Sequence, residues 1–166
     1  MSWVARLGGW SLAAALLLLA GCVSAPKSAG PVDTVNGPWS GRLALQVEDK
    51  PEQSFSAGFE LKGAPRAGEL TLFSPLGGTL AVLAWQPDSA TLRANGDTRQ
   101  FESVDALIGH VTGTPIPVAA LFDWLKGVNT SVAGWRADLS QLAQGRLAAR
   151  RLEPVPQADL RVVLER

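Results

Sequence analysis

The sequence predicts a mainly β (α+β) domain in which a single antiparallel sheet carries two helices inserted after its sixth strand. Two observations lead to this fold class. Consecutive segments from Trp39 onward alternate apolar and polar side chains with a period of two, which is typical of strands with one apolar face. After Ser103 the period becomes helical, and strand-like segments return from Trp135. A sheet of about nine short antiparallel strands tends to curl or to close on itself.

The first six strands follow from alternation and from the turn residues that separate them. The run from Thr79 to Trp85 is apolar on both sides. Either Leu80 with Val82, or Ala81 with Leu83 and Trp85, could therefore face the interior. Asn95-Gly96 is a hairpin signal between the fifth and sixth strands. The predicted strands are residues 39–47, 54–62, 69–73, 79–85, 89–94 and 98–101.

Two helices are predicted next. Ser103 is a suitable N-cap, apolar residues follow at helical spacing, and Thr112 to Pro115 end the first helix. The second helix begins near Pro117 and closes at Gly127. Residues 135–139, 146–152 and 159–164 are the remaining strands. The inside of a curled sheet can be filled by its own large side chains, by helices or by an apolar ligand, and the pattern leaves these alternatives open.

The N-terminus has the organisation of an export signal. Arg6 precedes an apolar run from Trp10 to Ala20, which is shorter than the roughly 20 residues that a membrane-spanning helix needs. The run ends in Leu-Ala-Gly-Cys, which resembles the lipobox of bacterial lipoproteins, and Cys22 is the only cysteine in the chain. We therefore expect residues 1–21 to be a signal peptide and Cys22 to carry lipid. A short permanent membrane helix is the alternative.

Composition narrows the remaining functions. Lysine plus arginine and aspartate plus glutamate both number 15, so the formal net charge is zero and nucleic-acid binding is not expected. Residues 23–37 are small and proline-rich, which is typical of a flexible tether. The sequence thus predicts a lipidated N-terminus and tether over residues 22–37, followed by one domain over residues 38–166.

No catalytic, cofactor or metal site is predicted. His110 is the only histidine, and without further cysteine or histidine there is no set of metal ligands and no recognisable Ser-His-Asp arrangement. Arg146, Arg150 and Arg151 allow two interpretations. They form either a basic edge for an acidic partner surface or a solvated strand end.

Two segments, together with the lipobox, carry a resemblance to a known family. Residues 75–79, Pro-Leu-Gly-Gly-Thr, follow a strand, and Gly-Thr-Pro-Ile-Pro-Val at residues 113–118 is followed by spaced Leu121 and Trp124. From Trp39 to Leu139 the chain resembles the LolB family, the outer-membrane receptors of the lipoprotein-sorting pathway. The resemblance implies a sheet curled into a half-open β-barrel, with helices inserted over its mouth and an apolar cavity inside.

The resemblance also implies partners and a location. The chain would lie lipid-anchored on the periplasmic face of the cell outer membrane, accept lipoproteins by their acyl chains from the periplasmic carrier LolA, and insert them into the inner leaflet. The loop between the third and fourth strands would hold the exposed apolar residue that insertion requires, here Leu76 between Pro75 and Gly77. An exposed leucine needs no functional explanation by itself. We expect a monomer.

The apolar strand faces and the helix stripe are either ordinary core or the wall of the implied cavity. A closed barrel filled by these side chains would instead suit a scaffolding or sensing lipoprotein, and a hydrolase with an unrecognised catalytic set is a further rival. The residues proposed to line an acyl cavity are Leu43, Leu45, Phe55, Phe59, Leu61, Leu70, Leu72, Leu83, Leu107, Ile108, Leu121 and Phe122.

Overall fold

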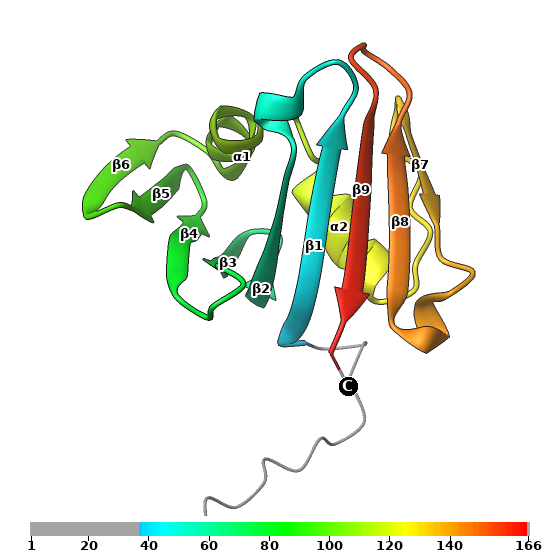
Figure 1. Cartoon of the computed structure of the whole chain (residues 1–166), viewed down its shortest axis with the longest axis horizontal. Helices are drawn as coiled ribbons and strands as arrows, with labels where there is room; N and C mark the ends of the chain where they lie inside the picture. The colour runs from blue at the N-terminus through cyan, green and yellow to red at the C-terminus, as the bar shows by residue number, and fades with distance from the viewer. Residues whose placement is uncertain (1–36, 166) are drawn as a thin grey trace, which may run out of the picture.

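The computed structural model describes residues 37–165 (Figure 1). The predicted signal peptide, lipidated Cys22 and nearly all of the tether lie outside the described residues. The strands are β1 (Trp39–Val47), β2 (Phe55–Ala64), β3 (Ala67–Phe73), β4 (Thr79–Gln86), β5 (Ser89–Ala94), β6 (Asp97–Phe101), β7 (Trp135–Asp138), β8 (Arg146–Arg151) and β9 (Ala158–Leu164). The helices are α1 (Val104–Thr112) and α2 (Val118–Leu125), with short 3-10 turns η1 (Pro51–Gln53) and η2 (Leu142–Gln144).

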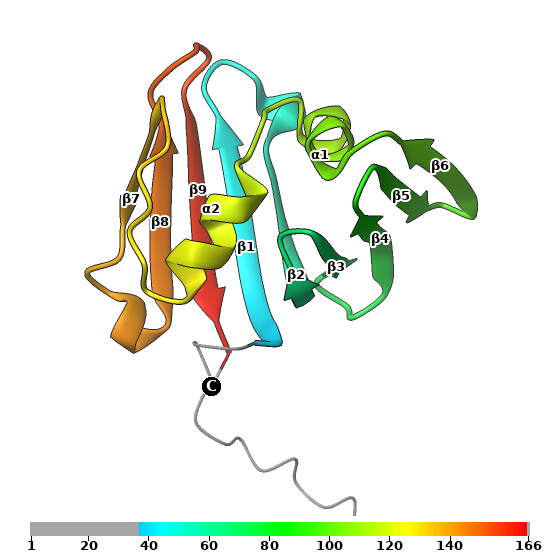
Figure 2. The same ribbon diagram turned by 180° about the vertical axis from the view of Figure 1, so that it is seen from behind.

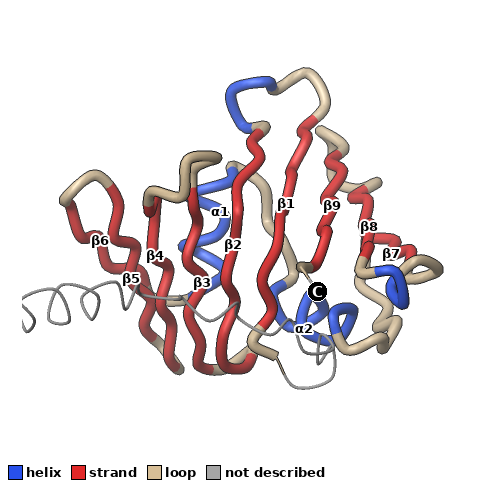
Figure 3. Tube along the Cα trace, turned by 60° about the horizontal axis from the view of Figure 1, so that its bottom comes forward, coloured by secondary structure: helices blue, strands red, loops and turns tan. Residues whose placement is uncertain are grey.

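All nine strands form one antiparallel sheet in the order β6-β5-β4-β3-β2-β1-β9-β8-β7 (Figure 3). The first six strands pair with their neighbours in sequence, and the last three return on the other side of β1. The first and last strands of the described domain pair there, with Leu43 of β1 opposite Val162 of β9. The edge strands β6 and β7 do not pair with each other, so the sheet is curled but open. The predicted half-open barrel with two inserted helices is confirmed.

Both helices lie on the concave side of the sheet. Helix α1 packs against β4, β5 and β6, whereas α2 crosses in front of β1 and β9 in the view of Figure 2. The ends of α1 match the sequence prediction: the Ser103 hydroxyl accepts a hydrogen bond from the Ala106 amide at 3.1 Å, and Gly113 adopts a left-handed φ of +63°. The linker of residues 113–117 between the helices therefore crosses from one half of the sheet to the other.

Aromatic side chains join α2 to the sheet. The ring of Phe122 meets Trp39 of β1 edge-on at 5.5 Å and Trp85 of β4 at 6.3 Å between ring centroids. These contacts settle the ambiguous strand at residues 79–85, because Trp85 faces inward with Leu83, whereas Leu80 is 48% exposed. Within residues 37–165, neither helix has the length and apolar character needed to cross a membrane.

Candidate functional site

An apolar cavity lies between the concave face of the sheet and the two helices. It exposes only apolar atoms, and the space open to the centre of a water-sized sphere is about 70 Å³. Its walls come from strands β1 to β4, strand β9 and both helices. The predicted cavity residues that line it are Leu43, Phe55, Phe59, Leu61, Leu70, Leu72, Leu83, Ile108, Leu121 and Phe122.

Two of the proposed residues lie elsewhere. Leu45 and Leu107 do not line the cavity, and both side chains pack within the hydrophobic core. On α1 the cavity side is formed by Val104, Ile108 and Val111, which share one helical face. The helical spacing of these apolar residues can be read from the sequence. The rotation of the helix against β4 and β5 decides which of them face the cavity.

Other wall residues could not be assigned from pattern alone. Leu160 and Val162 line the cavity because β9 lies next to β1, and this pairing joins opposite ends of the domain. Ile116 comes from the linker between the helices. Among the described residues that form the wall, Thr112 alone is polar, and its hydroxyl donates to the Ile108 carbonyl oxygen at 2.8 Å. With that hydroxyl satisfied, the interior offers no polar group to a ligand.

The cavity is small in this conformation. A space of about 70 Å³ is well below the roughly 150 Å³ of an engineered cavity that holds benzene. A long acyl chain therefore fits only if the helices move away from the sheet. The walls allow such movement, because they are divided between the sheet and two helices. Among the described residues, side-chain hydrogen bonds join the helical region to the sheet from Arg99 to His110 and from Arg151 to Thr114, and none of these four residues lines the cavity.

The loop at residues 74–78 holds one leucine in solvent. The Ser74 amide donates to the Gly78 carbonyl at 2.8 Å, the Gly77 amide donates to the Ser74 carbonyl at 2.9 Å, and the Ser74 hydroxyl accepts from the Gly78 amide at 3.1 Å. Gly77 has a φ of +83°, which favours glycine. Leu76 projects from this closed turn with 99% of its surface exposed, and Pro75 and Gly77 beside it are exposed too.

A buried arginine supports the linker over the cavity. Arg151 is 3% exposed, donates to the Pro156 carbonyl at 2.6 Å and lies 3.4 Å from the hydroxyl of buried Thr114 in the linker. Its Nε has no hydrogen-bond partner among the described residues, and burial lowers the pKa of the guanidinium. The side chain thus joins β8 to the helix linker at the cost of desolvating a cation.

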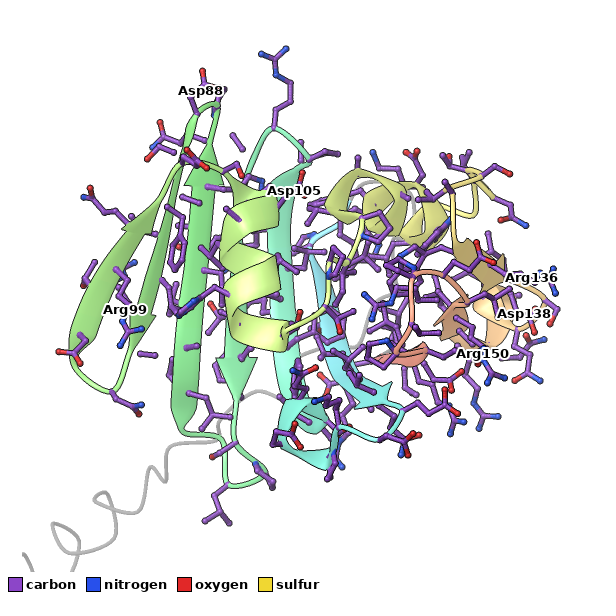
Figure 4. The ribbon with its side chains drawn as sticks, turned by 90° about the horizontal axis from the view of Figure 1, so that it is seen from above. Asp88, Arg99, Asp105, Arg136, Asp138 and Arg150 are labelled. Carbon is purple, nitrogen blue, oxygen red and sulfur yellow. The ribbon has the colours of Figure 1, made fainter. Side chains whose placement is uncertain are left out.

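The three arginines considered as one basic edge do not share a face. Strand β8 alternates, so Arg146 and Arg150 are exposed on the outer side while Arg151 is buried on the inner side. In Figure 4 the labelled Arg136, Asp138 and Arg150 lie together on β7 and β8. Arg150 pairs with Asp159 at 3.8 Å, and both of these side chains are about half exposed.

A model of the family described as outer membrane lipoprotein LolB matches residues 38–154. The chain belongs to the LolB family. That match spans β1 to β8, both helices and the Leu76 loop.

Individual members of the LolB family are similar over most of the chain. The outer-membrane lipoprotein LolB of Bordetella petrii is 37% identical over 148 residues, which cover 85% of this chain and 72% of the relative. The Bordetella parapertussis protein of the same name is 39% identical over 184 aligned residues, with 95% and 92% coverage. The Cupriavidus taiwanensis protein, again of this name, is 36% identical over 137 residues, with 80% and 66% coverage.

Replacing Arg151 tests the support of the linker. Arg151→Ala should lower the free energy of unfolding by about 1.5–3 kcal/mol, because the Pro156 carbonyl and the Thr114 hydroxyl lose a charged donor. Urea unfolding measures the change. Arg146→Ala is the matched control, since Arg146 is exposed on the same strand, and it should change stability by less than about 0.5 kcal/mol. Equal effects of the two substitutions would contradict the role assigned to Arg151.

Proposed function

We propose that this chain is an outer-membrane lipoprotein receptor that inserts lipoproteins into the membrane. In this proposal lipid on Cys22 anchors it to the periplasmic face of the outer membrane, and it accepts cargo from the carrier LolA. The observation that carries the proposal is the wholly apolar cavity between sheet and helices. Membership of a family described as outer membrane lipoproteins supports the location.

The physical reason for such a cavity is the cost of exposing acyl chains to water. At ~0.8 kcal/mol per methylene, a chain of about 14–16 methylenes costs on the order of 10 kcal/mol to expose. Transfer from the cavity of a carrier to the cavity of a receptor replaces one apolar environment by another. The handover then needs only a small difference in affinity, so the proposal includes no catalysis, cofactor, metal or nucleic acid, and one copy of the chain suffices.

Delivery would use the loop at residues 74–78. Leu76, held out by Pro75 and the Gly77 turn, would enter the boundary between head groups and acyl chains. Burial of one leucine is worth ~1.5–3 kcal/mol, which is enough to position the domain and too little to anchor it. In the proposal the lipid on Cys22 therefore supplies the attachment, and Leu76 marks where cargo leaves.

A charge in the cavity wall tests the acceptance step. Leu121→Asp should reduce acceptance of a labelled lipoprotein from the carrier by at least roughly tenfold, because a carboxylate beside an acyl chain loses its hydration. Transfer is measured together with saturable binding of a fluorescent apolar probe. Ala119→Asp is the matched control, since Ala119 is exposed on the same helix α2. Normal acceptance by folded Leu121→Asp would remove the cavity from the mechanism.

The small volume of the cavity favours one other candidate function. A scaffolding or sensing lipoprotein would keep its interior filled by its own side chains, and about 70 Å³ of free space is close to that state. The apolar probe separates the two candidates. The receptor binds it saturably, with a loss of binding in Leu121→Asp, whereas the scaffold binds none.

A further inference from the structure

A second hollow lies on the outer face of the sheet, on the side opposite the helices. It is a groove of about 530 Å³ bordered by β1, β2, the end of β3 and the loop at residues 74–78. The outer face of β1 and β9 is turned toward the viewer in Figure 1, with α2 behind it. The groove is separate from the apolar cavity, because strands β1 and β2 lie between them.

The groove exists because the outward side chains on its floor are small. Ser40 of β1 and Ser56 and Gly58 of β2 line it. Gly58 lies opposite Arg42 of β1 and opposite Phe73 of β3. Because glycine has no side chain, a gap remains between the side chain of Arg42 and the ring of Phe73. Unlike the cavity, this hollow exposes more polar than apolar surface.

Opposite charges line the same groove. Arg42 supplies a cation, and Glu60 and Glu165 supply carboxylates. Glu60 is paired with Lys62 at 2.6 Å, but neither the guanidinium of Arg42 nor the carboxylate of Glu165 has a hydrogen-bond or ion-pair partner among the described residues. Within residues 37–165, the groove therefore presents one unpaired cation, Arg42, and one unpaired anion, Glu165, to a ligand.

The surroundings of the groove indicate which kind of ligand binds there. One rim is formed by Pro75 and Gly77, on either side of Leu76, and the other includes Pro38, where the described domain begins. The β3–β4 loop extends from the lower edge of Figure 4, which is the side that faces the viewer in Figure 1. In the proposed delivery geometry, where Leu76 enters the membrane, the groove beside its loop lies next to the head groups.

We propose that the groove binds the phosphoethanolamine head group of a membrane phospholipid, with Arg42 on the phosphate and Glu165 on the ammonium. A zwitterion matches a groove that carries both charges, and charge-assisted hydrogen bonds to phosphate and ammonium are the strong ones. A purely anionic head group would leave the carboxylate of Glu165 without a partner. This site deepens the proposed function, on which it rests, because it would orient the domain for the loop at residues 74–78 to deliver cargo.

The test uses the full chain in micelles of an uncharged maltoside detergent and the soluble probe glycerophosphoethanolamine, which has no acyl chains to enter the apolar cavity. Backbone amide shifts of β1 and β2 should saturate with this probe, and Arg42→Gln should weaken the response at least tenfold. Arg93→Gln is the matched control, since Arg93 is exposed on β5 outside the groove, and it should bind as the unchanged protein does. With nanodiscs that contain phosphatidylethanolamine, the unchanged protein and Arg93→Gln should again bind equally well, and Arg42→Gln should bind more weakly.

Several results would overturn the head-group site. These are no saturable response of the unchanged protein to either probe, an equal response to inorganic phosphate, an equal response to phosphatidylglycerol nanodiscs, or no effect of Arg42→Gln. Acceptance of lipoprotein from the carrier is measured in parallel and should be normal in Arg42→Gln. If the unchanged protein accepts no lipoprotein, the proposed receptor function is refuted. If it accepts lipoprotein but its amide shifts do not respond to the probe, only the head-group site in the groove is refuted.

Discussion

Leu76→Glu should leave the protein folded and able to accept cargo, while its delivery of lipoproteins into membranes falls at least roughly tenfold. Burial of a leucine at the acyl boundary contributes ~1.5–3 kcal/mol, and each 1.4 kcal/mol is a factor of about ten. A carboxylate at the same position adds a penalty for dehydration. Folding should be unaffected, because the side chain of Leu76 is 99% exposed and makes no packing contact that stabilises the domain.

The measurement is the transfer of a labelled lipoprotein from the loaded protein into liposomes, with acceptance from the carrier followed separately. Val155→Glu is the matched control, since Val155 is an apolar residue with 79% exposure in the β8–β9 loop. It should deliver cargo normally. If Leu76→Glu also delivers cargo at the normal rate, the loop at residues 74–78 is an ordinary surface turn.

Phe122→Ala should lower the free energy of unfolding by about 3–5 kcal/mol, which is more than the loss expected for Arg151→Ala. Phe122 is completely buried, and its ring contacts Trp39 and Trp85 edge-on. The truncation leaves a hole between α2 and two strands, β1 and β4, which are separated in the sheet by β2 and β3. Because the side chain also lines the cavity, the same change should alter binding of the apolar probe.

Urea unfolding gives the free energy for this comparison. Phe101→Ala is the control of equal size change, because Phe101 is only partly buried at the end of β6, where its ring meets that of His110 at 5.2 Å. It should cost less than about half as much as Phe122→Ala. Similar costs for both would show that α2 is not fastened to the sheet through Phe122.

Much of the local structure could be predicted because it depends on neighbouring residues. Alternation placed β1 and β2, since the side chains of a strand point to opposite faces in turn. Ser103 and Gly113 marked the ends of α1 through capping chemistry that acts within one helical turn. The turn around Leu76 was likewise predicted, and the structure places that leucine in solvent.

The sequence by itself thus determined the strands and helices, the apolar sides of β1 and β2 and the exposed loop, whereas the inward side of β4 was decided by the tertiary structure. Only the tertiary structure decided which apolar residues became cavity wall, because that depends on contacts between distant segments. Val162 lines the cavity since β9 pairs with β1, whereas Leu45 on the neighbouring strand is sealed in the core. Periodicity is a property of consecutive residues, but the space left between a sheet and its helices is the remainder after all side chains have packed.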